Sequence, residues 1–278
     1  MSRSTNMSAM LKKILVPRWR ELTLGVLSLV LFVLVWHGVS WYLHETSSDL
    51  TPFVPSPRSV GEALWKSASY LPGLDRYTMW DLTESSLSRV ILGFFVALLL
   101  AFPLGLLMGG SRIAEYMGKP LVEMFRPIPP LAWVPVFLLA FHAFWGPVAI
   151  VFLGAFFPIL LNVMFGVKNV DQTLVDAART LGAKKLDIFV KVVVPSVVPY
   201  LMTGVKIGLG VAWMCIVAAE YTGLSGGAGL GYYVMLSGTG GQYSYMYATM
   251  IMIGILSILT AGVAGLLEQR FYKWSGMK

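Results

Sequence analysis

Long apolar stretches separated by short polar segments dominate the chain. The stretches 22–43 and 90–111 contain no Asp, Glu, Lys or Arg. Each has the roughly 20 apolar residues that a helix needs to cross a hydrocarbon layer about 30 Å thick. Both stretches are therefore predicted to be transmembrane helices.

A third stretch, residues 127–167, runs for 41 positions without a formal charge. A straight helix of that length would measure about 60 Å, twice the thickness of the layer. We therefore predict that the chain folds back at residues 141–147 and crosses twice. Two further spans are expected at 196–219 and 246–267. The pattern predicts an all-α polytopic membrane protein with six transmembrane helices.

Composition agrees with a membrane protein and excludes several other classes. Hydrophobic residues make up 56% of the 278 positions, whereas Asp, Glu, Lys and Arg make up 13%. A soluble domain of this size could not hide so much apolar surface from water, and typical globular chains carry about 25% charged residues. The single cysteine, Cys215, excludes an intrachain disulfide.

The positions of Lys and Arg predict the orientation. Sixteen of them lie before the first predicted span, between spans two and three, between spans four and five, or after span six. Three, Arg58, Lys66 and Arg76, lie between spans one and two. Because basic residues collect in cytoplasmic loops, both termini are predicted to be cytoplasmic, in a cell membrane. The net charge of +7 is thereby explained by the membrane, with no nucleic-acid partner.

This orientation divides the chain into three parts. Residues 1–21 form a cytoplasmic N-terminal segment and residues 269–278 a cytoplasmic tail. Between them, residues 22–268 form the transmembrane domain, with an outer loop at 44–86 and a cytoplasmic loop at 168–195.

Motifs for catalysis on this chain are weak. Residues 223–227 match G-x-S-x-G, but all three histidines precede them and none is placed to act as the base of a serine nucleophile. We interpret the match as a glycine-rich loop. The sequence has no G-x-x-x-x-G-K-[ST] phosphate-binding loop and no clustered metal-ligand spacing. Any ATP that drives this protein is therefore expected to bind to another chain.

The cytoplasmic loop carries a distinctive pattern. Residues 176–195 read as a helix, a glycine break at Gly182, a second amphipathic helix and a proline at Pro195. Ala177 and Ala178 would allow another backbone to approach closely, and apolar side chains alternate with lysines after the break. The residues alone leave two interpretations open: a helix lying on lipid headgroups, or a docking site for a soluble partner.

The same segment resembles the EAA loop of ATP-binding-cassette (ABC) importer permeases, whose pattern is E-A-A-x3-G-x9-I-x-L-P. Asp176, Ala177, Ala178, Gly182 and Pro195 stand at the matching positions. Asp176 replaces the glutamate of the pattern, and valines at 192 and 194 replace its Ile and Leu. Residues 126–135, RPIPPLAWVP, are similar to a stretch found in permeases of the nitrate/sulfonate/taurine/bicarbonate group. Order and spacing agree with that group from about residue 50 to residue 274.

The resemblance implies a type I ABC importer permease (MetI-like) fold. It implies a subunit that translocates a small anionic solute delivered by an external binding protein, periplasmic or lipid-anchored. It also implies a second permease subunit in a homodimer and a cytoplasmic ABC ATPase dimer that binds ATP and Mg, with no cofactor and no enzymatic activity on this chain.

The residues that the resemblance assigns to ATPase coupling lie in the cytoplasmic loop. They are Asp176, Ala177, Ala178, Gly182, Lys184, Leu186, Phe189 and Pro195. The alternative function is a non-transporting membrane scaffold or receptor that uses the same fold. An ion-coupled secondary transporter is less favoured, because it would place acidic residues inside its spans and only Glu220 approaches that position.

Three charges within or beside the spans need an explanation, because charge is costly in lipid. Arg89 and Glu220 are predicted at similar depth on the outer side, either as an ion pair or with separate interface roles. Lys206 could extend toward the cytoplasmic surface or contact solute. All three are candidate gate or structural residues. The pairs Gly105/Gly109 and Gly204/Gly208 are predicted to permit close helix packing.

Overall fold

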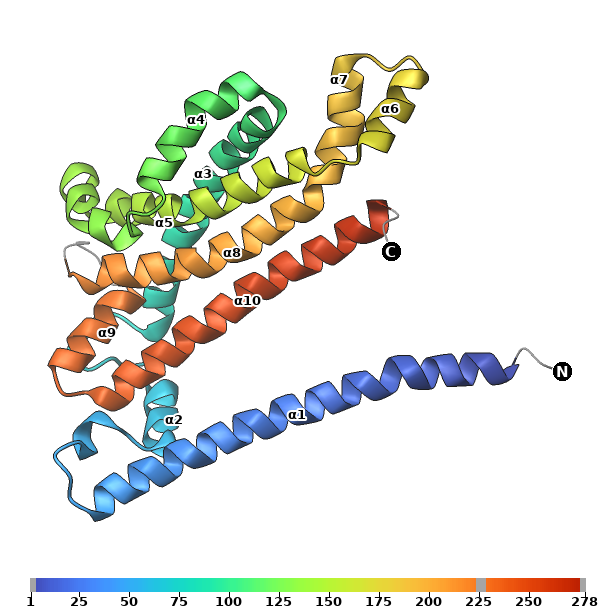
Figure 1. The fold of residues 1–278 in the computed structure, drawn as a ribbon. Helices are drawn as coiled ribbons and strands as arrows, with labels where there is room; N and C mark the ends of the chain where they lie inside the picture. The colour runs from blue at the N-terminus through green and yellow to red at the C-terminus, as the bar shows by residue number, and fades with distance from the viewer. Residues whose placement is uncertain (1–3, 224–228, 276–278) are drawn as a thin grey trace. The chain divides into compact units, whose positions relative to one another are not determined.

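A computed structural model describes residues 4–223 and 229–275, and all regular secondary structure in this part of the chain is helical (Figure 1). The side chains of 4–18, 21, 142 and 271–275 are not described. The elements, in chain order, are α1 (Ser4–Glu45), η1 (Thr51–Phe53), α2 (Pro57–Lys66), α3 (Met79–Gly110), α4 (Arg112–Phe125), η2 (Pro130–Trp133), α5 (Val134–Lys168), α6 (Gln172–Thr180), α7 (Lys185–Ile188), the π-helical turn η3 (Phe189–Val193), α8 (Val194–Tyr221), α9 (Leu230–Thr239) and α10 (Tyr243–Ser275).

The chain divides into two compact units, Met1–Trp65 and Lys66–Lys278. In the first unit the segment after α1 folds back onto that helix. The indole nitrogen of Trp36 donates to the Pro55 carbonyl at 3.0 Å, and the Ser40 hydroxyl donates to the Val54 carbonyl at 3.1 Å. These bonds anchor the connecting segment to the end of α1.

Five described segments are long and apolar enough to cross a membrane: Leu22–Glu45, Met79–Gly110, Ala143–Lys168, Lys185–Tyr221 and Tyr243–Arg270. A sixth is obtained if Arg112–Phe125 and Pro130–Phe141, which meet at 82°, form one bent span. We call these segments the candidate spans. The all-helical polytopic fold predicted from the sequence is confirmed.

The structure corrects the third span. Residues 112–126, predicted to be a loop, form α4 and become the first half of the bent candidate span. The helix breaks at residues 126–130 because Pro127, Pro129 and Pro130 cannot donate backbone hydrogen bonds and disfavour helical geometry in the residue before them.

The predicted fold-back at 141–147 is confirmed, although it lies within the helical range of α5. A Cβ atom on Gly146 would lie 3.0 Å from the Leu138 Cα atom and 3.1 Å from the Phe137 carbonyl oxygen. In a straight helix, positions eight residues apart are separated by about 12 Å. The chain therefore turns back between Leu138 and Gly146, and only glycine leaves room for the other arm.

Helices α3, α5 and α8 pack together at the centre of the second unit, with α10 alongside α8 (Figure 1). Two apolar clusters fill their contacts. One contains Ile150, Trp213 and Ile216, and the other contains Ala101, Ile159 and Val163. The long helices are thus held by apolar contacts along their whole length.

Small residues bring these helices into backbone contact, as the sequence predicted. A Cβ on Gly105 of α3 would lie 2.9 Å from the Leu160 carbonyl oxygen, and one on Gly109 would lie 2.9 Å from the Met164 carbonyl oxygen. Gly204 of α8 approaches the Pro158 carbonyl with the same closeness, at 3.1 Å. Helix association in lipid depends on such close contacts, because lipid is as apolar as the side chains themselves.

We expect Gly105→Ala to lower the free energy of unfolding by about 1–3 kcal/mol, because the methyl group would overlap Val163 and the Leu160 carbonyl. The control is Gly262→Ala on α10, where a Cβ would meet no atom within 4 Å. Thermal unfolding of the purified protein in detergent measures both. Equal stability of the two variants would contradict the close α3–α5 contact.

Candidate functional site

A buried ion pair joins α3 to the end of α8. The Arg89 Nη1 atom lies 2.6 Å from the Glu220 Oε1 atom, and the side chains are 4% and 0% exposed. The sequence left open whether these charges pair or act separately. The structure shows that they pair.

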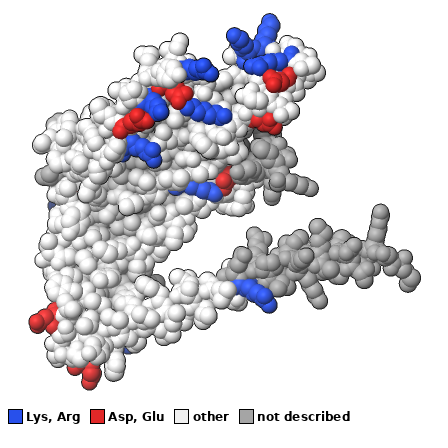
Figure 2. Space-filling model, viewed as in Figure 1, with Lys and Arg blue, Asp and Glu red and all other residues white. Residues whose placement is uncertain are grey.

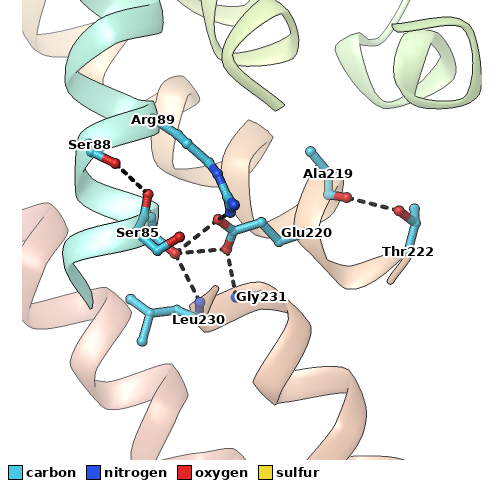
Figure 3. Close-up of polar contacts among 9 residues, drawn as sticks. Ser85, Ser88, Arg89, Ala219, Glu220, Thr222, Leu230 and Gly231 are labelled. Atoms are coloured by element: carbon cyan, nitrogen blue, oxygen red, sulfur yellow. Dashed lines mark hydrogen bonds and ion pairs between the residues drawn. The ribbon is translucent and has the colours of Figure 1, made fainter. Parts of the chain in front are cut away.

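Hydrogen bonds to the Glu220 carboxylate bring in the start of α9 (Figure 3). The Ser86 hydroxyl donates to this carboxylate at 2.8 Å, and the backbone N–H of Gly231 donates to it at 3.0 Å. The Ser86 oxygen in turn accepts the backbone N–H of Leu230 at 2.9 Å. One carboxylate therefore holds α3, α8 and α9 together. We call Ser86, Arg89 and Glu220, with the backbone N–H groups of Leu230 and Gly231, the buried polar cluster.

Glycines allow the backbone of α9 to reach this carboxylate. A Cβ on Gly229 would lie 2.3–2.5 Å from the Glu220 carboxylate atoms, and one on Gly231 would lie 2.4 Å from the Val217 carbonyl oxygen. The Arg89 guanidinium also lies over the Phe144 ring, 5.7 Å from its centroid, a distance typical of a cation–π contact. The fold-back of α5 thus completes the surroundings of Arg89.

A second ion pair joins α8 to α10. Lys206 Nζ contacts the Glu268 carboxylate, and the side chains are 41% and 16% exposed. The sequence left open a solute contact for Lys206. In the structure its charge is balanced by Glu268 instead.

The predicted helix–break–helix pattern is present in the loop. Helix α6 ends at Thr180, and Gly182 adopts a positive φ of +80°, as expected for a glycine that ends a helix. Upstream, hydrogen bonds from the Thr173 side chain and backbone N–H lower the pKa of the Asp171 carboxyl, which caps α6.

The second helix of the loop differs from the prediction in one respect. Residues 185–221 are helical without interruption, as α7, η3 and α8, so Pro195 lies inside the helix and does not begin it. Pro195 cannot donate the hydrogen bond to residue 191 of a regular α-helix, and the π-helical turn at Phe189–Val193 lies where that bond would form. Residues 185–193 are therefore a continuous extension of α8.

The two alanines of the loop have different surroundings. Ala178 is half-buried with Ala183 and Phe189 against the second apolar cluster, whose members include Val175 and Ile188. Ala177 is exposed.

Three leucines of the loop are exposed, as Ala177 is. Leu174, Leu181 and Leu186 are 52%, 88% and 73% exposed. We call Leu174, Ala177, Leu181 and Leu186 the outer loop surface, meaning the exposed residues of the cytoplasmic loop at 168–195 and not the loop at 44–86. Lys184 is also exposed, and Asp176 pairs with Arg179 at 3.0 Å.

The described part of the chain contains no candidate metal site. No group of three or more His, Cys, Asp or Glu side chains among the described residues could hold a metal ion. Residues 224–227 of the G-x-S-x-G match lie outside the described residues.

Residues 101–273 match the family model described as "Binding-protein-dependent transport system inner membrane component". The matched range covers α5, the loop and α8–α10, together with the C-terminal part of α3. The chain belongs to this family. It is an ABC importer permease, and the resemblance inferred from its motifs is confirmed.

Relatives of the permease match along nearly their full length. It is 32% identical over 262 residues to the taurine transport system permease protein TauC of Escherichia coli, covering 94% of this chain and 92% of the relative. It is 33% identical over 268 residues to the bicarbonate transport system permease protein CmpB of Synechococcus elongatus, covering 92% and 90%.

A solved structure supports the fold. The permease matches a chain of the MetNI methionine ABC transporter in an inward-facing conformation with a TM-score of 0.59 and 20% identity. The match covers 69% of the permease and 97% of that chain. The predicted MetI-like fold is thereby confirmed.

Sequence reasoning missed several partners in these sites. Ser86 and Glu268 were not singled out, nor were the N–H groups of Leu230 and Gly231. Ser86 lies three residues before Arg89, on the same helical face, and this spacing was the available signal. Nothing local connects Glu268 to Lys206, since 62 positions separate them.

We expect Arg89→Ala and Glu220→Ala each to destabilise the permease by about 3–5 kcal/mol, because either change leaves a buried charge without its partner. The double variant should lose less than the sum of the single losses, with a coupling free energy above about 1 kcal/mol. Unfolding of the four proteins in detergent gives this value. Additive losses would show that the 2.6 Å contact contributes no pairing energy.

Proposed function

We propose that the permease carries a small anionic solute across the cell membrane, driven by a cytoplasmic ABC ATPase that docks on the outer loop surface. The observation that carries this proposal is the exposure of Ala177 and three leucines on a loop whose second helix continues into α8. Force applied to this segment would pass into a helix that packs against α5 and α10.

The outer loop surface suits a protein partner better than lipid headgroups. Lys184 and Lys185 are exposed, but so are the acidic Asp176 and the small Ala177. A helix that lies on a membrane presents large apolar residues in a continuous stripe, with basic residues on the other face. A groove in a protein instead accommodates a small residue flanked by larger apolar ones.

ATP and Mg are assigned to the partner ATPase, because this sequence has no phosphate-binding loop. The permease itself then performs no covalent chemistry. Its coupling residues under this proposal are Asp176, Ala177, Gly182, Lys184 and Leu186, while Ala178, Phe189 and Pro195 position them from within the fold.

The remaining partners follow from the family. Its description names a binding-protein-dependent system, which supports an external binding protein as the source of solute. We assign the permease to a homodimer, with both termini cytoplasmic as the distribution of Lys and Arg indicates. Its solute is proposed to be a small oxyanion or sulfonate, because the two relatives are named for taurine and bicarbonate.

The buried polar cluster and the Lys206–Glu268 pair have structural roles in this proposal. Arg89 and Glu220 fasten α9 to the ends of α3 and α8, on the opposite end of α8 from the loop (Figure 1). Lys206 and Glu268 fasten α8 to α10. Motion that starts at the loop is thereby carried by a connected set of helices.

Docking predicts that Ala177→Trp reduces both copurification of the ATPase and solute uptake by about tenfold or more, because added bulk overlaps a close-packed partner. The matched control is Gln172→Trp, an exposed position of α6 about 140° around the helix from Ala177. Copurification from membranes and uptake into cells measure the two effects.

Both variants should insert normally, because neither position is buried. Normal ATPase retention and uptake with Ala177→Trp would remove the docking role of α6. The loop would then be a membrane-surface helix, and the alternative function as a scaffold or receptor would be favoured.

The orientation predicts that a cysteine at Ser69 reacts with an impermeant thiol reagent from outside intact cells, and that one at Lys185 reacts only after the cells are opened. The native Cys215 is buried, so its background should be low. Reaction of both cysteines from the same side would rule out the proposed arrangement.

A further inference from the structure

A cavity of about 330 Å³ lies beside the break between α4 and η2. Its walls come from that break, from the middle of α5 and from α8, and they are mostly apolar. Two side chains with hydrogen-bond donors also line it, Arg126 and Asn162. The cavity is separate from the buried polar cluster and from the outer loop surface, which contribute no lining residues.

Arg126 differs from three cations that form ion pairs between helices. Arg89 pairs with Glu220, Lys206 with Glu268 and Lys168 with Glu115. Among the described residues, no acidic side chain forms an ion pair with Arg126. It lies at the proline break of the bent candidate span, fourteen positions after Arg112, and its side chain is exposed.

The position and the chemistry of Arg126 both indicate that it could bind an anion. A charge held within a membrane-spanning segment is costly, and one without a protein partner there points to a functional ligand. A guanidinium matches planar or tetrahedral oxyanions through paired N–H donors. The Asn162 amide donates to the Pro158 carbonyl at 2.8 Å and has a second N–H available for a ligand oxygen.

We propose that Arg126 and Asn162 form an anion-binding site in this cavity, where a nitrate-, sulfate- or sulfonate-like group rests while it crosses the permease. This inference rests on the proposed function and adds to it the residues that contact the solute. Apolar walls weaken competing hydration and leave Arg126 as the main source of attraction, with Asn162 orienting the oxyanion.

A thiol-labelling experiment tests the site without knowledge of the natural solute. The full-length permease carries Cys215→Ala, which removes its native thiol, and Ile207→Cys, which places a reporter on the α8 wall of the cavity. Ile207 is 49% exposed, so a reagent can reach it. The protein is held in nanodiscs of phosphatidylcholine, so that no anionic lipid headgroup competes.

Two methanethiosulfonate reagents of similar size are compared, one bearing a sulfonate and the other a trimethylammonium group. Their rate ratio at Ile207→Cys is divided by the ratio at an exposed reference, Ser69→Cys. We expect a preference of about tenfold for the sulfonate reagent, because the Arg126 charge attracts the sulfonate and repels the trimethylammonium group. Nitrate, sulfate or taurine at millimolar concentration should slow the reaction.

Variants assign this preference to residues. Arg126→Gln should abolish both the preference and the protection by anions, and Arg126→Lys should keep most of the preference but weaken the protection. Asn162→Ala should weaken protection while leaving the charge preference. The matched control is Lys119→Gln, which removes one positive charge from an exposed position of α4 and should change nothing.

The outcomes are decisive in both directions. An unchanged ratio with Arg126→Gln, repeated with a second reporter at Leu161→Cys on α5, would overturn the site and indicate that Arg126 extends to the lipid headgroups. Protection only by added anionic lipid would also overturn it. Labelling needs neither ATPase nor binding protein, so normal ATPase retention in the Ala177→Trp test would reject the proposed docking without affecting this result.

Discussion

Because the interior of a bilayer holds no water, a charge within this helix bundle must be balanced by the protein or by a ligand. Arg89 meets this constraint most fully, since Glu220 lies 2.6 Å away and both side chains are buried. The surroundings of this ion pair explain two further features of the fold. Glycines at 229 and 231 let α9 approach, and the fold-back of α5 brings Phe144 over the guanidinium. Arg126 has no acidic partner among the described residues.

Charge within the second unit is unevenly placed. Lys, Arg, Asp and Glu side chains gather over α4 and the α6–α7 loop, whereas much of the remaining visible surface has none (Figure 2). The broad uncharged surface suits lipid, and the charged α6–α7 loop suits a water-filled compartment with a soluble partner. The loop has one side packed on the bundle and one side open, which is the arrangement that a transmitting segment requires.

Rigid coupling between the loop and the bundle follows from local chemistry. The π-helical turn lets the chain continue through Pro195 without a break, so α7 and α8 form one continuous helical segment. Close glycine contacts join α8 to α5, and Lys206 joins it to α10. A displacement of α7 would therefore pass along a continuous helix toward the cavity beside Arg126.

The sequence by itself determined the helical spans other than the third, the fold-back at 141–147 and the glycine break at Gly182, because hydrophobic length and turn chemistry are local properties of the chain. Other features came only from the tertiary structure. Ala177 faces outward while Ala178 packs inward, and Ser86 joins the Arg89–Glu220 pair. These depend on which distant segments meet, and contacts across more than a hundred positions leave no periodic signal in the sequence.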